Sequence, residues 1–208
     1  ADASGTATFS TGVISGAGAI TKSGAGSVVL SGNNTYGGST TINEGTLVVG
    51  AAAPSGSSGA LGNASSAVLL GNTSGSSNAS LITNGAFAVA RAITVQAGNT
   101  GTITIGGTGA NSASFTGNIT LDKAVTLTAD ASGTATFSTG VISGAGAITK
   151  SGAGSVVLSG NNTYSGGTTI SAGILSISSD GSLGAVPVSA VANSIILSGG
   201  VLQSVGSA

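Results

Sequence analysis

The ionisable side chains of this sequence are few and widely spaced. It contains no histidine and no cysteine, so the Ser–His, Cys–His and zinc arrangements that most hydrolases use cannot be built. Carboxylates clustered with a lysine or an arginine could still cleave an acidic polysaccharide. The candidate acids are Asp2, Glu44, Asp122, Asp130 and Asp180.

These acids form no convincing catalytic pair. Asp2 and Asp130 occupy the same position of an internal repeat, and Asp122 adjoins Lys123 in an expected turn. The other two acids lie far from these in sequence. We therefore predict isolated, solvated charges, no enzyme activity, and no catalytic, metal-binding or cofactor-binding residues.

The remaining cations do not fit a phosphate site or an active site. Both Lys22 and Lys150 follow threonine, and not the glycine that a P-loop requires. Arg91 interrupts the alternation of FAVARAITV (87–95), where continued alternation would turn its side chain inward. Because arginine is rarely fully buried, we predict a strand break there and not a buried functional arginine.

The composition excludes several classes of function. Four basic and five acidic residues leave a net charge of −1, which is too little positive charge for nucleic-acid binding. A surface with almost no net charge promotes association. No window offers about eighteen uninterrupted apolar residues, and the segment ADASGTATFS lacks a basic region followed by an apolar stretch, so we expect no membrane helix and no signal peptide.

The pattern of apolar residues predicts an all-β chain. Short alternating segments are separated by Gly, Asn or Ser, as strands are separated by turns. In TITI (102–105) and AVTLT (124–128), the period of two sends the aliphatic side chains to one face and the threonines to the other. With 38 glycines and 3% aromatic residues, any core must be narrow.

An internal repeat is the main evidence for the architecture. Residues 1–36 recur without a change as residues 129–164, and the likeness then fades, so that the repeat covers 1–50 and 129–178. In a parallel solenoid, each coil stacks on the last at about 4.8 Å, so like residues lie over like residues and a repeating sequence is favoured. We predict one continuous β-solenoid over residues 1–208, with coils of roughly twenty residues and about six coils between the start of one copy and the start of the next.

Glycine and asparagine are expected at the corners of the coils. Glycine supplies positive φ, and the pairs Asn33-Asn34 and Asn161-Asn162 tolerate the left-handed region and can form side-chain ladders between coils. The stretch 51–78 is the most irregular part of the sequence, because it is rich in Ser, Gly and Asn and includes Pro54. We expect it to be an excursion from the coils.

The segment Ile142–Leu175 resembles the passenger-associated transport repeat, also called the autotransporter-associated β-strand repeat. It matches the family pattern of spaced glycines, a lysine, an aliphatic run, S-G-N-N-T-Y and G-G-T-T-I, and its first half recurs over Ile14–Tyr36. The resemblance implies a right-handed parallel β-helix in a large secreted bacterial protein. It implies no enzyme activity and no cofactor.

We expect a structural role, either as the repeating body of an extracellular fibre or matrix or as a shaft at the bacterial cell surface. The expected partner is the chain itself, through head-to-tail stacking, with the cell surface or a matrix as a further contact. The alternative is an adhesin-type passenger stem that binds host or neighbouring cells through loops such as 51–78. An ice-binding solenoid and a polysaccharide lyase are weaker alternatives; the outward threonines look too unevenly spaced for the former.

Overall fold

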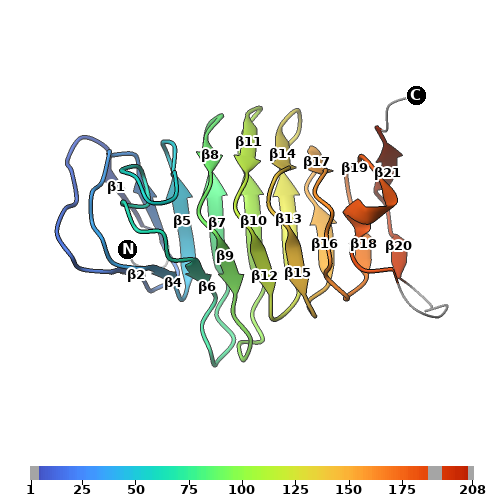
Figure 1. Cartoon of the computed structure of the whole chain (residues 1–208), viewed down its shortest axis with the longest axis horizontal. Helices are drawn as coiled ribbons and strands as arrows, with labels where there is room; N and C mark the ends of the chain where they lie inside the picture. Colours follow the sequence, from blue (N-terminus) through green and yellow to red (C-terminus); the bar gives the residue numbers. More distant parts are fainter. Residues whose placement is uncertain (1–4, 187–193, 206–208) are drawn as a thin grey trace.

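The chain folds into a parallel β-solenoid of about eight turns (Figure 1). The computed structural model describes residues 5–186 and 194–205. Three sheets run along the axis, and every pairing between named strands is parallel. The predictions of an all-β chain and of a solenoid are confirmed.

The sheets are named here by their place in Figure 1. The nine strands of the long sheet are β1 Thr6–Phe9, β3 Ser27–Leu30, β5 Gly45–Val49, β7 Ala79–Thr83, β10 Ile103–Gly107, β13 Val125–Ala129, β16 Ile148–Ser151, β18 Thr168–Ile170 and β20 Ile195–Leu197. The upper sheet holds β8 Ala88–Val89, β11 Ser112–Phe115, β14 Thr134–Phe137, β17 Ser155–Leu158, β19 Ile174–Ile177 and β21 Val201–Ser204. The lower sheet holds β2 Ile20–Lys22, β4 Thr40–Ile42, β6 Val68–Leu70, β9 Ile93–Val95, β12 Ile119–Leu121 and β15 Ile142–Gly144.

A narrow apolar core lies between the three sheets. Ile103 and Ile105 of β10 and Val125 and Leu127 of β13 are buried, as their alternation predicts. The core is aliphatic for most of its length, and the rings of Phe115 and Phe137 stack within it. Each coil contributes a few side chains to one continuous core, so burial depends on the coils on either side.

The outward side chains of the long sheet form one column of hydroxyls. Eight of the nine strands place a threonine or serine at the same register, so the hydroxyls of neighbouring coils lie side by side, and the ninth strand, β20, has Ile196 there. The column is Thr6, Ser27, Thr46, Ser80, Thr104, Thr126, Thr149 and Thr169.

This regularity corrects the expectation that the outward threonines are unevenly placed. The next outward column of the long sheet contains Val29, Val48 and Ile82, so only one column is continuously hydroxylated. The single column remains unlike the two-dimensional array that an ice-binding face would need. The fold therefore adds little support to the ice-binding alternative.

The two identical copies of the repeat lie on different faces of the solenoid. The segment SVVL forms β3 in the long sheet and β17 in the upper sheet, and ITK begins β2 in the lower sheet and β16 in the long sheet. Five strands of the long sheet follow β3 up to β16, and β17 is the next strand of the chain. The interval between the copies thus spans five coils and one face, slightly less than the expected interval of about six coils.

The length of each coil explains this rotation. Ser27 of β3 lies beside Thr46 of β5, whereas Gly45 of β5 lies beside Ala79 of β7, so the second coil is longer by most of the irregular stretch 51–78. The coils of the repeat have two strands and an irregular arm, whereas the coils between β7 and β16 use all three sheets. Because the lengths differ, the same sequence enters the solenoid at two different faces.

The described part of the chain contains one helix, the 3-10 turn η1 at Asp180–Leu183. No helix within residues 5–186 and 194–205 is long and apolar enough to cross a membrane.

Candidate functional site

The polar residues of the repeat lie inside the solenoid, where they join one coil to the next. Lys150 is fully buried, and its Nζ donates to the carbonyl oxygens of Ser151 at 2.7 Å, Gly152 at 2.8 Å and Ala172 at 3.0 Å. Burial lowers the pKa of Lys150 to about 8. Since Ala172 belongs to the following coil, the ammonium ties two coils together.

Lys22 occupies the same position in the first copy. Its Nζ donates to the carbonyl oxygens of Ser23, Gly24 and Glu44, with the last at 2.9 Å. Burial lowers the pKa of Lys22, and the nearby Glu44 carboxylate partly opposes that effect. The sequence offered a signal for both lysines, because the alternation of ITK places lysine on the same face as isoleucine.

The second asparagine of each Asn-Asn pair joins the coils on both of its sides. The Oδ1 of Asn162 accepts from the Ile142 N–H at 2.9 Å, and its Nδ2 donates to the Ser182 carbonyl at 2.8 Å. Asn34 makes the same two bonds with Ile14 and Ala60. The expected ladder of paired asparagine side chains is therefore wrong, since these amides bond to backbone.

The expected left-handed conformation of these asparagines is also wrong. Ser132, with a φ of 63°, is the non-glycine residue with positive φ among those described. The corners use glycine for that purpose. At Gly45 and Gly173, a φ of 71° and 62° respectively turns the chain into the following strand.

A buried tyrosine completes the corner in each copy. The Tyr36 hydroxyl lies 2.8 Å from Thr40 Oγ1, and the Tyr164 hydroxyl lies 2.7 Å from Thr168 Oγ1. Burial raises the pKa of both phenols, and the threonine hydrogen bond lowers it in part. The aromatic ring thus fills the corner while its polar atom is satisfied.

A short turn from the next coil docks on each corner. The segments GALG (59–62) and GSLG (181–184) bring Gly62 against the ring of Tyr36 and Gly184 against the ring of Tyr164. An added Cβ on either glycine would overlap the tyrosine backbone oxygen. The stretch 51–78 therefore contains an ordered turn with a counterpart in the second copy, which the sequence comparison missed because the intervening residues differ.

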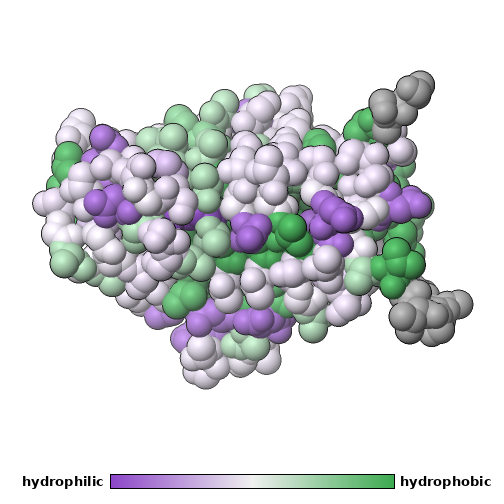
Figure 2. All heavy atoms as spheres, in the orientation of Figure 1, coloured by the Kyte–Doolittle hydropathy of each residue, from purple (hydrophilic) through white to green (hydrophobic). Residues whose placement is uncertain are grey.

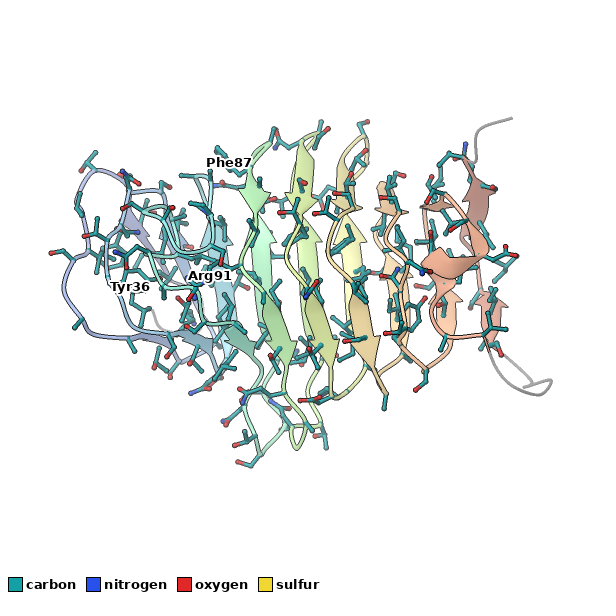
Figure 3. All side chains as sticks on the ribbon, in the orientation of Figure 1. Tyr36, Phe87 and Arg91 are labelled. Atoms are coloured by element: carbon teal, nitrogen blue, oxygen red, sulfur yellow. The ribbon has the colours of Figure 1, made fainter. Side chains whose placement is uncertain are left out.

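Arg91 is fully buried beside this turn. Its Nη1 donates to the Leu61 carbonyl at 2.7 Å and its Nε to the Ser66 carbonyl at 2.9 Å. Figure 3 shows Arg91 within the solenoid, between Tyr36 and the strands of the middle coils. Burial lowers the pKa of Arg91, and the Tyr36 phenol partly opposes this.

The sequence interpretation of Arg91 is half right. The strand break is present, because β8 ends at Val89 and β9 begins at Ile93. The inward alternation nevertheless continues through the break, and Val89, Arg91 and Ile93 are all buried. The guanidinium is accommodated because backbone carbonyls satisfy it, and this role requires no reactive partner.

The acidic side chains are not brought together. Asp122 and Asp130 lie at opposite ends of β13, and Asp130 Oδ2 accepts from the Gly109 N–H at 2.8 Å. Asp2 lies outside the described residues. Within the described residues, no group of three or more acidic side chains could hold a metal ion.

Glu44 lies apart from the other acids, in an open groove of about 460 Å³ on the solenoid. The groove is lined by Ala25, Glu44, Gly45, Thr46, Asn78 and Ser80. A carboxylate, an amide and two hydroxyls thus lie around one open space.

The family model of the passenger-associated transport repeat matches residues 20–49 and 148–177. Each match contains the buried lysine, asparagine and tyrosine of one copy. The chain contains two passenger-associated transport repeats.

A curated relative of this repeat protein is the Adhesin BmaC autotransporter of Brucella suis biovar 1 (strain 1330). It is 33% identical over 211 residues, which cover 99% of this chain and 5% of the relative. No solved structure matches the chain. The repeat and the relative together support a segment of a secreted passenger.

Within the passenger-associated transport repeat, the geometry assigns the motif residues to coil stacking. The lysine, asparagine and tyrosine are buried and bond to atoms of the same or the adjacent coil. These contacts explain why the pattern uses these residue types. None of the three needs a ligand to be satisfied.

Proposed function

We propose that this segment is a rigid shaft in a secreted passenger at the bacterial cell surface. The observation that carries the proposal is the joining of successive coils by buried polar side chains, such as Lys150 with Ala172 and Asn162 with both Ile142 and Ser182. A sheet bonded along its whole length, with a continuous core, resists bending. In this role the segment is not an enzyme and holds other parts of the passenger away from the cell.

Electron microscopy of the purified chain and of a tandem of two copies would test the shaft. The nine strands of the long sheet span eight spacings of about 4.8 Å, or roughly 38 Å. The tandem should be a straight particle of about twice that length. A tandem that bends sharply at varied positions, or that collapses into a compact particle, would contradict the proposal.

The self-association that we propose is end to end, between the edge strands of the long sheet. The edge strands of the long sheet expose apolar side chains, with Phe9 at one end and Ile195, Ile196 and Leu197 at the other. A further coil of a longer chain or a second molecule could cover such a face. Sedimentation velocity at rising concentration should show larger particles for wild type but not for Ile196→Lys, because the added lysine places a charge on this apolar face. Equal association of the two proteins would exclude contact through this face.

A second candidate function is adhesion through a lateral ridge formed by the loops 71–78 and 96–101. The Thr100 N–H donates to the Gly75 carbonyl at 2.9 Å, and Lys123 Nζ donates to the Asn99 and Gly101 carbonyls, each at 2.6 Å. Figure 1 shows these green loops projecting below the solenoid, and Figure 2 shows hydrophilic residues at the same edge. The relative's name includes the word adhesin, which favours a binding role for some part of such passengers.

Shortening the ridge tests adhesion independently of the shaft. Replacing Thr73–Ser77 by two glycines should abolish cell binding by a displayed passenger while the rod remains intact in the microscope. Unchanged binding would exclude the ridge. Deleting all of 51–78 would be a poor test, because that stretch contains β6 and the turn that docks on Tyr36.

A further inference from the structure

The groove at Glu44 lies on the hydroxyl column of the long sheet. Register places Thr46 beside Ser80, and Gly45 beside Ala79, so Glu44 and Asn78 precede the paired strands at matching positions. Glu44, Thr46, Asn78 and Ser80 all line the groove. Two neighbouring coils thus present four polar side chains to the same open space.

Two of the residues that line this space are small. Gly45 adopts a φ of 71° and has no side chain, and Ala25 of the preceding coil contributes only a methyl group to the lining. A Cβ at Gly45 would contact backbone oxygens of Gly24 and Gly26. The close approach of the preceding coil therefore requires glycine at position 45, beside the groove.

The groove offers both hydrogen-bond acceptors and donors. Glu44 is the ionisable residue of its lining, and its carboxylate can accept several hydrogen bonds. The Oδ1 of Asn78 accepts from the Thr102 N–H at 2.7 Å, which leaves Nδ2 as the donor of that amide. The two hydroxyls can donate or accept.

The second copy of the repeat lacks this polar set. Ala172 stands at the position of Glu44 and Ile174 at the position of Thr46, and Val201 lies beside Ile174 in the next coil. The backbone of the turn is similar, with Gly173 at a φ of 62°. Coil stacking thus does not require a carboxylate at the position of Glu44 or a hydroxyl at the position of Thr46, and both groups are available to a ligand.

We propose that the groove binds a sugar unit of a polysaccharide that lies along the hydroxyl column, with amine-bearing sugars preferred. Its ligand must supply several closely spaced hydroxyl or amine groups to Glu44 and Asn78. A linear polysaccharide does so at intervals comparable with the strand spacing of about 4.8 Å. A protein partner fits less well, because the lining has no apolar or aromatic pocket for an anchoring side chain.

The binding at one groove is weak, and the column extends it. The lining contains no aromatic ring on which a sugar could stack, so affinity depends on hydrogen bonds and on the carboxylate. Hydroxyls at Ser27 and Thr104 continue the column in both directions. A chain of several sugars should therefore bind more tightly than a monosaccharide.

The test uses the purified chain and three hexasaccharides: glucosamine, N-acetylglucosamine and galacturonic acid. Titrations followed by ¹H–¹⁵N spectra should shift the amide signals of residues 44–46 and 78–80, and calorimetry should rank the glucosamine hexamer above its acetylated form. The acidic hexamer should not bind, because its carboxylates face Glu44.

Matched variants separate the groove from general attraction between charges. Glu44→Gln should weaken binding of the glucosamine hexamer about tenfold, whereas Asp122→Asn removes the same charge from an exposed turn and should change nothing. The double variant Thr46→Val, Ser80→Val should weaken both the amine and the acetylated hexamers. Its circular dichroism spectrum and melting temperature report whether it is folded.

The proposal is overturned if neither the glucosamine hexamer nor the N-acetylglucosamine hexamer binds, or if the amide signals shift over the whole surface. It is also overturned if Asp122→Asn weakens binding as much as Glu44→Gln does. None of these outcomes concerns the length or straightness of the rod. The shaft can therefore stand if the sugar site fails, and the sugar site can stand if the tandem bends.

Discussion

Lys150 Nζ lies 3.0 Å from the carbonyl oxygen of Ala172, and this contact joins two successive coils through a buried cation. Two further carbonyls of its own turn accept from the same ammonium. Since Ala172 replaces the glutamate found beside Lys22, no carboxylate accompanies Lys150 at that position, and burial holds its pKa at about 8. The contact thus has a measurable dependence on pH.

We expect the stability of the chain to rise between pH 8 and about pH 9.5. The folded lysine titrates at about 8 and the unfolded lysine at 10.5, so the unfolded state binds more protons in this window, and the free energy of unfolding increases with pH. Below pH 8 the lysine is protonated in both states, and its contribution is constant. The complete effect would be at most about 3 kcal/mol.

Urea unfolding of wild type and Lys150→Met at pH 7.5, 8.5 and 9.5 measures this effect. The variant should show a smaller rise, with the remainder due to Lys22, whose pKa burial also lowers. Measurement stops before the tyrosines titrate, because their raised pKa values act in the opposite direction. An equal rise in both proteins would exclude Lys150 as the cause.

Asn162→Ala should lower the free energy of unfolding by about 2 kcal/mol, because it leaves the buried Ile142 N–H and Ser182 carbonyl without their partner. Asn161→Ala is the matched control, since Asn161 is the exposed neighbour in the same pair. Chemical denaturation should place the control within about 0.5 kcal/mol of wild type. Equal losses in the two variants would contradict the assigned roles.

Phe137→Ala should cost about 3–5 kcal/mol, because this ring is buried and stacks on Phe115 with centroids 4.8 Å apart. Phe9 occupies the same position of an identical TATF segment, but 48% of its surface is exposed, against 2% for Phe137. Phe9→Ala should therefore cost less than about 1 kcal/mol. Thermal unfolding of both variants measures how the loss of stability depends on burial, because the residue type and the local sequence are the same at the two positions.

The alternation of side chains could be predicted from the sequence because it is local. Ile103 and Ile105 face the core, and even Lys150 and Arg91 follow the period of two. The identical copies predicted stacked coils because equivalent residues lie over one another in a solenoid. What the alternation could not show was whether a buried cation would find acceptors, since those come from other coils, as Ala172 does for Lys150.

The faces of the solenoid could not be predicted, because they depend on the accumulated length of the coils. The same SVVL segment is β3 in the long sheet and β17 in the upper sheet. The groove was missed for a related reason. Glu44 and Asn78 meet only because the long coil that starts at Gly45 returns to the sheet at Ala79, and nothing in the composition of 51–78 fixes where that return occurs.

Gly146→Ala should destabilise the chain by more than about 2 kcal/mol, because the added methyl would overlap the carbonyl oxygen of Lys123 in the preceding coil. Gly18 is the same position of the first copy and has no heavy atom within 4 Å of an added Cβ. Gly18→Ala should be neutral within about 0.5 kcal/mol. Denaturation curves of the two variants decide whether glycine is required by the motif itself or by the coil beneath it. Equal losses would show that the local turn needs glycine, and a loss confined to Gly146→Ala would show that close stacking does.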